Sequence, residues 1–227
     1  MKKTLLILSL ITLTATFSQA QYNNKIKISI YGEVGLNIAN YYQSASSDKT
    51  LEISPIFRPM LGAYVRVKYP TLVGFDAGVN VSQLGTHAKD KSAALAVFGD
   101  TLVSKAVLNY AYAYTDALYF FELQGDNSIH AGVGLYGGYA LNGDQYIGSE
   151  KNKLYLKDNG WKRFDMGLQL KTDFNLRDLL TFGVQYRIGF SPVIKTVDKV
   201  GDFNNLRNSA LTITAAVRLF QTTKTQK

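Results

Sequence analysis

Strict alternation of apolar and polar residues runs through eight long segments of the chain. In the first of them, Ile28 and Ile30 flank the polar Ser29. A period of two is typical of a β-strand whose two faces meet different surroundings. The eight segments span residues 26–40, 56–69, 72–84, 105–123, 127–141, 161–174, 178–191 and 208–220. The pattern therefore predicts an all-β protein.

The lengths of the segments and of their connections indicate which kind of β protein this is. Strands of soluble proteins average about 5–6 residues, whereas a tilted strand needs about 9–11 to cross a membrane. Short breaks near 70–71, 124–128 and 175–178 alternate with long polar ones at 41–55, 85–104, 142–160 and 191–208. Bacterial outer-membrane barrels have short periplasmic turns and long extracellular loops. We therefore predict an eight-stranded antiparallel up-and-down transmembrane β-barrel in the bacterial outer membrane, with four long extracellular loops.

Alternation alone does not decide which face lies inside, since a soluble lipocalin-like barrel inverts the same pattern. The polar face is rich in glycine, which suits a narrow interior, and aromatic residues gather near the segment ends, as interfacial girdles do. We therefore expect the apolar face to meet lipid. The fourth segment opens on Leu108, Tyr110, Tyr112 and Tyr114 as its apolar positions, and we expect a bulge near Asp116.

With the apolar face outward, the charged residues of the strands point into the lumen, the space inside the barrel. Eight strands enclose a space that side chains can fill, so these charges are expected to pair as a structural network. An ion path or small-solute pore is the alternative. The inward set includes His130, Lys171 and Asp173, and the network is assigned to Glu33, Arg66, Asp76, Asp165, Arg187 and Arg218.

The first twenty residues are predicted to be a cleaved secretory signal peptide, which leaves residues 21–227 as the barrel. Lys2 and Lys3 precede an apolar stretch at 4–17, and small residues at Ser18 and Ala20 suit signal peptidase. Removal of residues 1–20 lowers the net charge from +8 to +6. The absence of cysteine excludes a lipoprotein anchor and disulfides. No later stretch has the 18 apolar residues of a membrane helix.

Few residues offer chemistry, so no catalytic, cofactor or metal site is predicted. The two histidines, His87 and His130, lie in different parts of the predicted barrel. The loop lysines are interspersed with acidic residues, which does not favour nucleic-acid binding but suits the phosphates of lipopolysaccharide. Three loop aromatics, Tyr146, Tyr155 and Trp161, are candidate anchors for a partner. They also fit the interfacial belt.

The chain resembles the small outer-membrane β-barrel domain proteins of Bacteroidetes, including the PorT-like barrels. The resemblance rests on residues 163–168, on 186–190, and on 208–220, which ends at Phe220, the aromatic read by the barrel-insertion machinery. Two departures are the missing proline after Asp116 and the seven residues that follow Phe220. The resemblance implies a non-enzymatic accessory to protein secretion or envelope assembly, and the predicted barrel is expected to be a monomer. A surface-interaction or adhesion barrel is the alternative.

Overall fold

The computed structural model describes residues 25–43, 52–98, 100–154, 161–193 and 206–225, so the predicted signal peptide lies outside the described residues. Within these ranges there are ten strands and one helix, α2. None of the described helical segments is long and apolar enough to span a membrane. The elements are β1 (Lys25–Gln43), β2 (Ile53–Ser54), β3 (Ile56–Lys68), β4 (Val73–Ala88), α2 (Lys91–Phe98), β5 (Val103–Glu122), β6 (Ser128–Ile147), β7 (Glu150–Leu154), β8 (Phe164–Leu176), β9 (Leu180–Pro192) and β10 (Leu206–Thr225).

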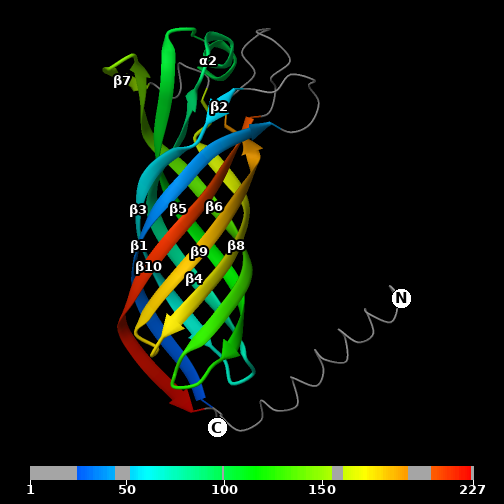
Figure 1. The fold of residues 1–227 in the computed structure, drawn as a ribbon. Coiled ribbons are helices and arrows are strands. Elements are labelled where there is room, and N and C mark those ends of the chain that lie inside the picture. The colour runs from blue at the N-terminus through cyan, green and yellow to red at the C-terminus, as the bar shows by residue number, and fades with distance from the viewer. Residues whose placement is uncertain (1–24, 44–51, 99, 155–160, 194–205, 226–227) are drawn as a thin grey trace, which may run out of the picture.

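Eight long strands close into a ring in which every pairing is antiparallel (Figure 1). The order around the ring is β1, β3, β4, β5, β6, β8, β9 and β10, and β10 pairs with β1 from Lys25–Thr225 to Gln43–Leu206. Each long strand therefore lies beside its neighbours in the chain, which is the up-and-down topology. Closure leaves none of the eight with a free edge in the body of the barrel. The predicted eight-stranded barrel is confirmed.

The two ends of the barrel differ in their connections, and we name them accordingly. At the short-turn end the strands are joined by residues 69–72, 123–127 and 177–179. At the long-loop end, β2, α2 and β7 lie beyond the ring of strands (Figure 1). Strands β5, β6 and β10 are each 20 residues long, and β10 continues to Thr225, beyond its predicted end at residue 220.

Side chains on the two faces of the wall have opposite chemistry. Outward residues such as Leu61, Val79 and Leu219 are 59%, 60% and 67% exposed, while inward Asp76 and Gln185 are fully buried. An outward apolar surface of this extent is stable only against lipid, because water would not solvate it favourably. The predicted apolar-outward orientation is confirmed by this burial.

The fourth predicted segment is an exception, because its faces are reversed. Tyr110, Tyr112 and Tyr114 point inward and are buried, while Ala111 and Ala113 face outward. Tyrosine resembles an apolar residue in the alternation, yet the hydroxyls of Tyr110 and Tyr112 have polar partners in the lumen, and alanine is tolerated against lipid. The predicted bulge near Asp116 is also wrong: β5 pairs with β6 in unbroken register there, and the register shifts between Asn109 and Tyr110 instead.

Candidate functional site

A group of ionisable side chains meets inside the short-turn half of the barrel, and we call it the lumen charge cluster. It consists of Arg66 on β3, Asp76 on β4, His130 on β6, and Lys171 and Asp173 on β8. Two register pairs bring these strands' side chains together: Arg66 lies opposite Asp76, and His130 lies opposite Asp173. All five residues are at most 3% exposed.

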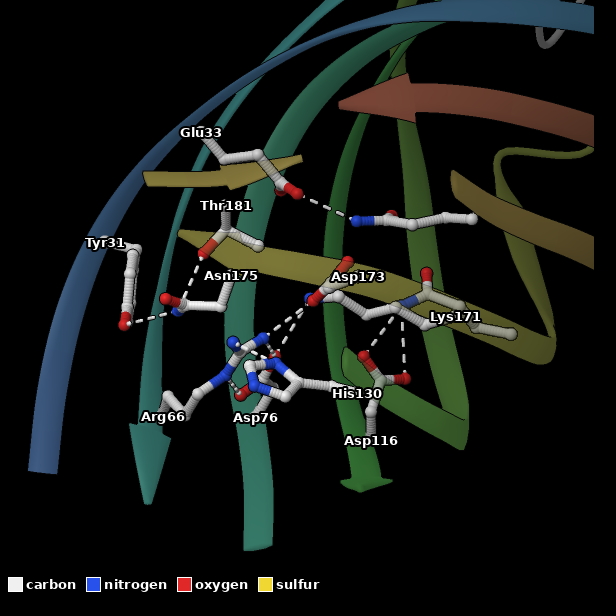
Figure 2. A network of polar contacts seen from close by, with 12 residues as sticks. Tyr31, Glu33, Arg66, Asp76, Asp116, His130, Lys171, Asp173, Asn175 and Thr181 are labelled. Atoms are coloured by element: carbon white, nitrogen blue, oxygen red, sulfur yellow. Dashed lines mark hydrogen bonds and ion pairs between the residues drawn. The ribbon is translucent and has the colours of Figure 1, made fainter. Parts of the chain in front are cut away.

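The Arg66 guanidinium links the two carboxylates of the cluster (Figure 2). Its Nε and Nη2 donate to the two oxygens of Asp76 at 2.8 and 2.7 Å, and Nη2 also donates to Asp173 at 2.7 Å. Lys171 Nζ lies 2.8 Å from Asp76 and 3.3 Å from Asp173. Two cations thus balance two carboxylates, with the bidentate geometry that makes a buried arginine–carboxylate pair strong.

Two tyrosines pack against the cations of this cluster. The rings of Tyr31 and Tyr64 stack with their centroids 4.8 Å apart. The Arg66 guanidinium carbon lies 5.4 and 5.2 Å from these two centroids, and Lys171 Nζ lies 4.4 Å from that of Tyr64. The negative faces of the rings add to the attraction that offsets burial of the cations.

His130 is held in a state that does not activate a nucleophile. Arg66 Nη1 lies 2.6 Å from His130 Nδ1, and Ser128 Oγ lies 2.7 Å from its Nε2. Because a guanidinium can only donate, Nδ1 must accept, and the ring proton then sits on Nε2 and faces the serine. A catalytic base would have to accept the serine's proton at that nitrogen. The pair is therefore a structural contact.

A second polar group occupies the lumen beside the charge cluster. Arg187 Nε donates to Gln169 at 2.8 Å, and Gln169 donates to Asp116 at 2.9 Å. Gln185 donates to Glu33 at 2.8 Å and accepts from Arg187 at 3.3 Å. Arg187 is thus linked to both carboxylates through glutamine side chains, which can donate and accept at once.

A third group surrounds Asp165 with neutral donors. Asn208 donates to its carboxylate at 2.9 Å, and the hydroxyls of Tyr136 and Tyr112 donate at 3.3 and 3.4 Å. Asn208 also donates to the Tyr110 hydroxyl at 3.3 Å. Donors from β5, β6 and β10 thus converge on one oxygen, Oδ2, of this buried carboxylate, which offsets part of the cost of burying it.

The six residues assigned to one charge network do not form a single network. Arg66 and Asp76 are paired directly, whereas Glu33, Asp165 and Arg187 belong to the two other groups. Arg218 is half-buried, and its guanidinium donates to Gln221. The sequence assignment omitted Asp116 and the inward tyrosines because it placed their strand in the opposite phase.

Many inward side chains of the described lumen are buried. A cavity at its short-turn mouth has a volume of about 20 Å³ and is lined in part by Lys27, Arg66, Lys68 and His130. That volume accommodates roughly one water molecule. Among the described residues, no group of three or more His, Cys, Asp or Glu side chains is arranged to hold a metal ion.

Described residues at the long-loop end pack as an apolar cluster, which we call the apolar cap. Trp161 is 4% exposed, and its ring lies 6.1 Å from that of Tyr41 and 6.4 Å from that of Phe98 on α2. The prediction of Trp161 as an exposed partner anchor is therefore wrong, since it is a core residue of this cap. Other members of the same buried cluster are Ile56, Leu84, Val97, Leu108, Leu154, Val193 and Leu206.

At the same end, the upper parts of β5 and β6 form a projecting sheet with β7, made of residues 103–109, 142–147 and 150–154, and Leu108 and Leu154 join this sheet to the cap. Tyr146 is half-buried, with Lys105 Nζ 4.1 Å from its ring centroid. Burial and the nearby charge of Arg58 lower the pKa of Lys105. Lys151 forms an ion pair with Asp144 at 3.0 Å, and this hydrogen bond raises the pKa of Lys151.

Two other predicted residues need separate mention. Tyr155 lies outside the described residues. Phe220 lies on the outward face of β10, 56% exposed and paired with Ile30 towards the short-turn end. Its recognition by the barrel-insertion machinery stays a prediction.

Comparison with solved structures finds small outer-membrane proteins. Neisserial surface protein A is 12% identical, with 85% of this chain and 99% of that chain covered and a TM-score of 0.48. Ail, the attachment invasion locus protein of Yersinia pestis, is 10% identical, with 85% and 98% covered and a TM-score of 0.39. OprG from Pseudomonas aeruginosa is 9% identical, with 90% and 97% covered and a TM-score of 0.39.

Comparison with protein-family models assigns the chain to a family. None of the curated proteins matches the chain. The family model described as the outer membrane protein beta-barrel domain matches residues 17–195, more than three quarters of the sequence. The matched region includes seven of the eight long strands described above. The chain therefore belongs to the outer membrane protein beta-barrel domain family and is a protein of the bacterial outer membrane.

Proposed function

We propose that this protein is a non-enzymatic surface-binding barrel that engages a partner at its long-loop end. The observation that carries the proposal is the difference between the two ends. The short-turn end consists of three connections of three to five residues, whereas the long-loop end has the apolar cap and the projecting sheet. A rigid, packed scaffold that presents loops is the usual arrangement of a recognition surface.

The buried side chains of the lumen favour binding over transport. The charge cluster, the Arg187 group and the Asp165 group all occupy the interior, with direct contacts of 2.6–3.4 Å. A pore of this diameter requires space that these side chains take up. The small-solute pore is therefore the weaker proposal, and planar-bilayer recordings are expected to show no stable conductance.

The projecting sheet suits a polar partner. Strand β7 is exposed from Glu150 to Lys153, and the sheet carries both positive and negative side chains, among them Lys105, Lys151 and Asp144. A half-buried aromatic such as Tyr146 surrounded by polar and charged side chains matches the aromatic centre and polar rim of a binding surface. The outer-membrane setting makes the exterior of the cell, or the lipopolysaccharide of its own surface, the source of such a partner.

The resemblance to PorT-like barrels supports a second proposal, an accessory role in secretion or envelope assembly. Its partners would arrive from the periplasm and meet the short-turn end, where Lys27, Lys68 and Asp178 surround the mouth of the barrel. The two proposals thus place the partner at opposite ends of the same barrel.

The experiment that separates them is site-specific photo-crosslinking in living cells. The crosslinking residue replaces Lys151 in the projecting sheet or, as the matched control, Asp126 in a short turn; both are exposed. A variant in which residues 144–153 are replaced by a two-residue turn removes the tip of the sheet while the ring of strands is kept, as checked by heat-modifiable migration.

Surface binding predicts crosslinked partners from position 151 and loss of binding in the shortened variant. Crosslinks from position 126 alone, together with a secreted proteome that changes on gene deletion, would instead establish the accessory role. Reproducible channels that change in Arg66→Ala would establish a pore.

A further inference from the structure

The outward wall over β3, β4, β5 and β6 carries a groove of about 800 Å³. Its floor is low because the outward residues there are small: Ala63, Ala111, Ala113 and Gly137. Val79 and Val81 of β4 stand between Ala63 and the small residues of β5 and β6, so the low floor runs mainly over β5 and β6. Leu61, Tyr139 and Phe164 stand at the end of the groove nearer the long loops. The groove has the volume of a pocket for a sizeable ligand, yet it faces the hydrocarbon of the membrane.

A notch of about 220 Å³ adjoins the groove on the side of the long loops, where Leu61 and Val81 line both. It forms because the β3–β4 pairing ends at Met60 and Ser82. The next residue of β3, Pro59, has no backbone N–H to continue the ladder. The Asn37 side-chain amide compensates from inside by donating to the carbonyls of Pro59 and Gln83 at 3.5 and 3.2 Å.

Polar and charged groups stand at this upper end of the groove. Gln83 and Asn109 line the notch, and Asn109 is bonded to Asn142. Arg163 is exposed, with its Nη1 3.4 Å from the carbonyl of Leu141, which lines the notch. The Arg163 guanidinium carbon also lies 5.8 Å from the ring centroid of Tyr139, which lines the groove. One cation therefore stands where the apolar groove meets the polar notch.

We propose that this groove and notch form a binding site for one lipopolysaccharide molecule of the outer leaflet. An acyl chain lies in the groove, a phosphate of the lipid A headgroup binds Arg163, and the amides at the notch contact the adjoining sugar. The side chains along the wall change in the order expected for an amphipathic anionic lipid. Towards the long loops they are first apolar, then aromatic, and finally amide and guanidinium groups. Because long loops of such barrels lie outside, the cationic end faces the leaflet that holds lipopolysaccharide.

The same features distinguish this lipid from other occupants. Arginine is the side chain best suited to a phosphate, since its planar fork donates two hydrogen bonds at once. A second copy of the barrel would present an apolar wall at this level and would leave Arg163 without an anion. The site lies in the wall rather than on the projecting sheet, so it stands independently of the proposed surface-binding function.

Gly137 offers a variant that fills the groove without strain. A Cβ added there meets nothing within 4 Å, and its φ lies outside the left-handed region. Gly137→Leu therefore places a side chain in the space assigned to the acyl chain, and Arg163→Ala removes the cation. Ala215→Leu is the matched control, because Ala215 also faces outward but lies on β10, on the opposite wall.

The test is native mass spectrometry of the full chain purified from outer membranes in mild detergent, with the bound lipid identified after extraction. We expect the parent protein and Ala215→Leu to retain one lipopolysaccharide. Gly137→Leu and Arg163→Ala are each expected to lower the retained fraction by about tenfold, because one loses the space and the other a charge-assisted contact. Heat-modifiable migration verifies that all four proteins are folded.

Several outcomes would overturn the proposal. Equal retention in all four proteins would show that the lipid binds elsewhere, and a retained phospholipid would show that the headgroup assignment is wrong. A dimer mass that Gly137→Leu abolishes would identify a second copy as the occupant. The four proteins are also reconstituted into phospholipid vesicles with and without lipopolysaccharide. Lipid retention is then compared again with a lipid of known composition.

Discussion

The short-turn half of the lumen and the long-loop end fill the same barrel with opposite chemistry. The first is packed with ion pairs and amides, and the second with the aromatic and aliphatic residues of the apolar cap. Burying an ion pair is costly unless its geometry is nearly ideal, whereas apolar packing tolerates rearrangement if volume is kept. The comparison teaches that the lumen charge cluster permits only one arrangement of the strands. The apolar cap, by contrast, can accept changes in the sequence of the loops that form it.

Register explains how the charged half acquires this specificity. Arg66 and Asp76 face each other across β3 and β4, and His130 and Asp173 face each other across β6 and β8. A slip of one residue in either pair of strands would turn a charged side chain towards lipid. Each correct pairing also completes the other, since Arg66 contacts Asp173.

The largest effect is expected from Arg66→Ala, which removes the link between the two carboxylates. Asp76 and Asp173 would keep only Lys171 as a cationic partner, and we expect a loss of about 4 kcal/mol in unfolding free energy. Urea unfolding in lipid vesicles, followed by heat-modifiable migration, measures it. Arg218→Ala is the control, because its side chain contacts Gln221 outside the cluster. Equal losses in both variants would contradict the distinction.

The next effect is expected in the apolar cap. Trp161→Ala leaves a cavity between Tyr41 and Phe98 and is expected to cost about 3 kcal/mol, confined to the long-loop end. Limited proteolysis of intact cells should then cleave the variant's loops faster, while its heat-modifiable migration stays that of the parent. If the barrel itself unfolds at lower urea, the cap and the lumen are one cooperative unit.

A smaller effect is expected from neighbouring glycines on opposite faces of β6. A Cβ at Gly138 would come within 2.1 Å of the Tyr112 ring, whereas one at Gly137 meets nothing within 4 Å. Gly138→Ala is expected to cost about 2 kcal/mol through overpacking of the lumen. Gly137→Ala should stay within about 0.5 kcal/mol of the parent. Parallel urea titrations compare the two; equal midpoints would mean that the lumen yields to added volume.

The smallest effect is expected from Asp144→Asn in the projecting sheet, where the ion pair with Lys151 is exposed to solvent. The raised pKa of Lys151 means that the pair contributes fully below the lysine's ordinary value and is lost only as the pH rises through the raised one. Between about pH 6 and 9 the variant should therefore unfold at a temperature only slightly below the parent's, by an amount that does not change with pH, because an exposed pair contributes little. A clear shift within that range would indicate a further partner for Asp144.

The architecture was predictable because alternation and loop lengths depend only on residue order. The eight strands, their topology and the outward apolar face follow from that pattern. The phase of β5 did not, because Tyr110, Tyr112 and Tyr114 are equally suited to an aromatic girdle and to a polar lumen; the alanines between them were the available signal.

The composition of each polar group was less predictable. Which carboxylate meets which cation depends on register and on reach across the lumen, as the Arg66–Asp173 contact shows. The burial of Trp161 depends on its packing against α2, which lies outside the strands. Such a segment shows no alternation of apolar and polar residues from which its packing could be predicted.

The seam between β1 and β10 also bears on how the chain could be reconnected. Lys25 lies opposite Thr225, so the two strand ends stand side by side at the short-turn end. A short linker could therefore join them, and the chain could be opened instead between Leu123 and Ser128 without crossing the barrel. In such a circular permutant Phe220 would occupy the middle of the polypeptide. Assembly of that permutant would test the prediction that the barrel-insertion machinery reads Phe220, because the residue would keep its place in the wall while its place along the polypeptide changed.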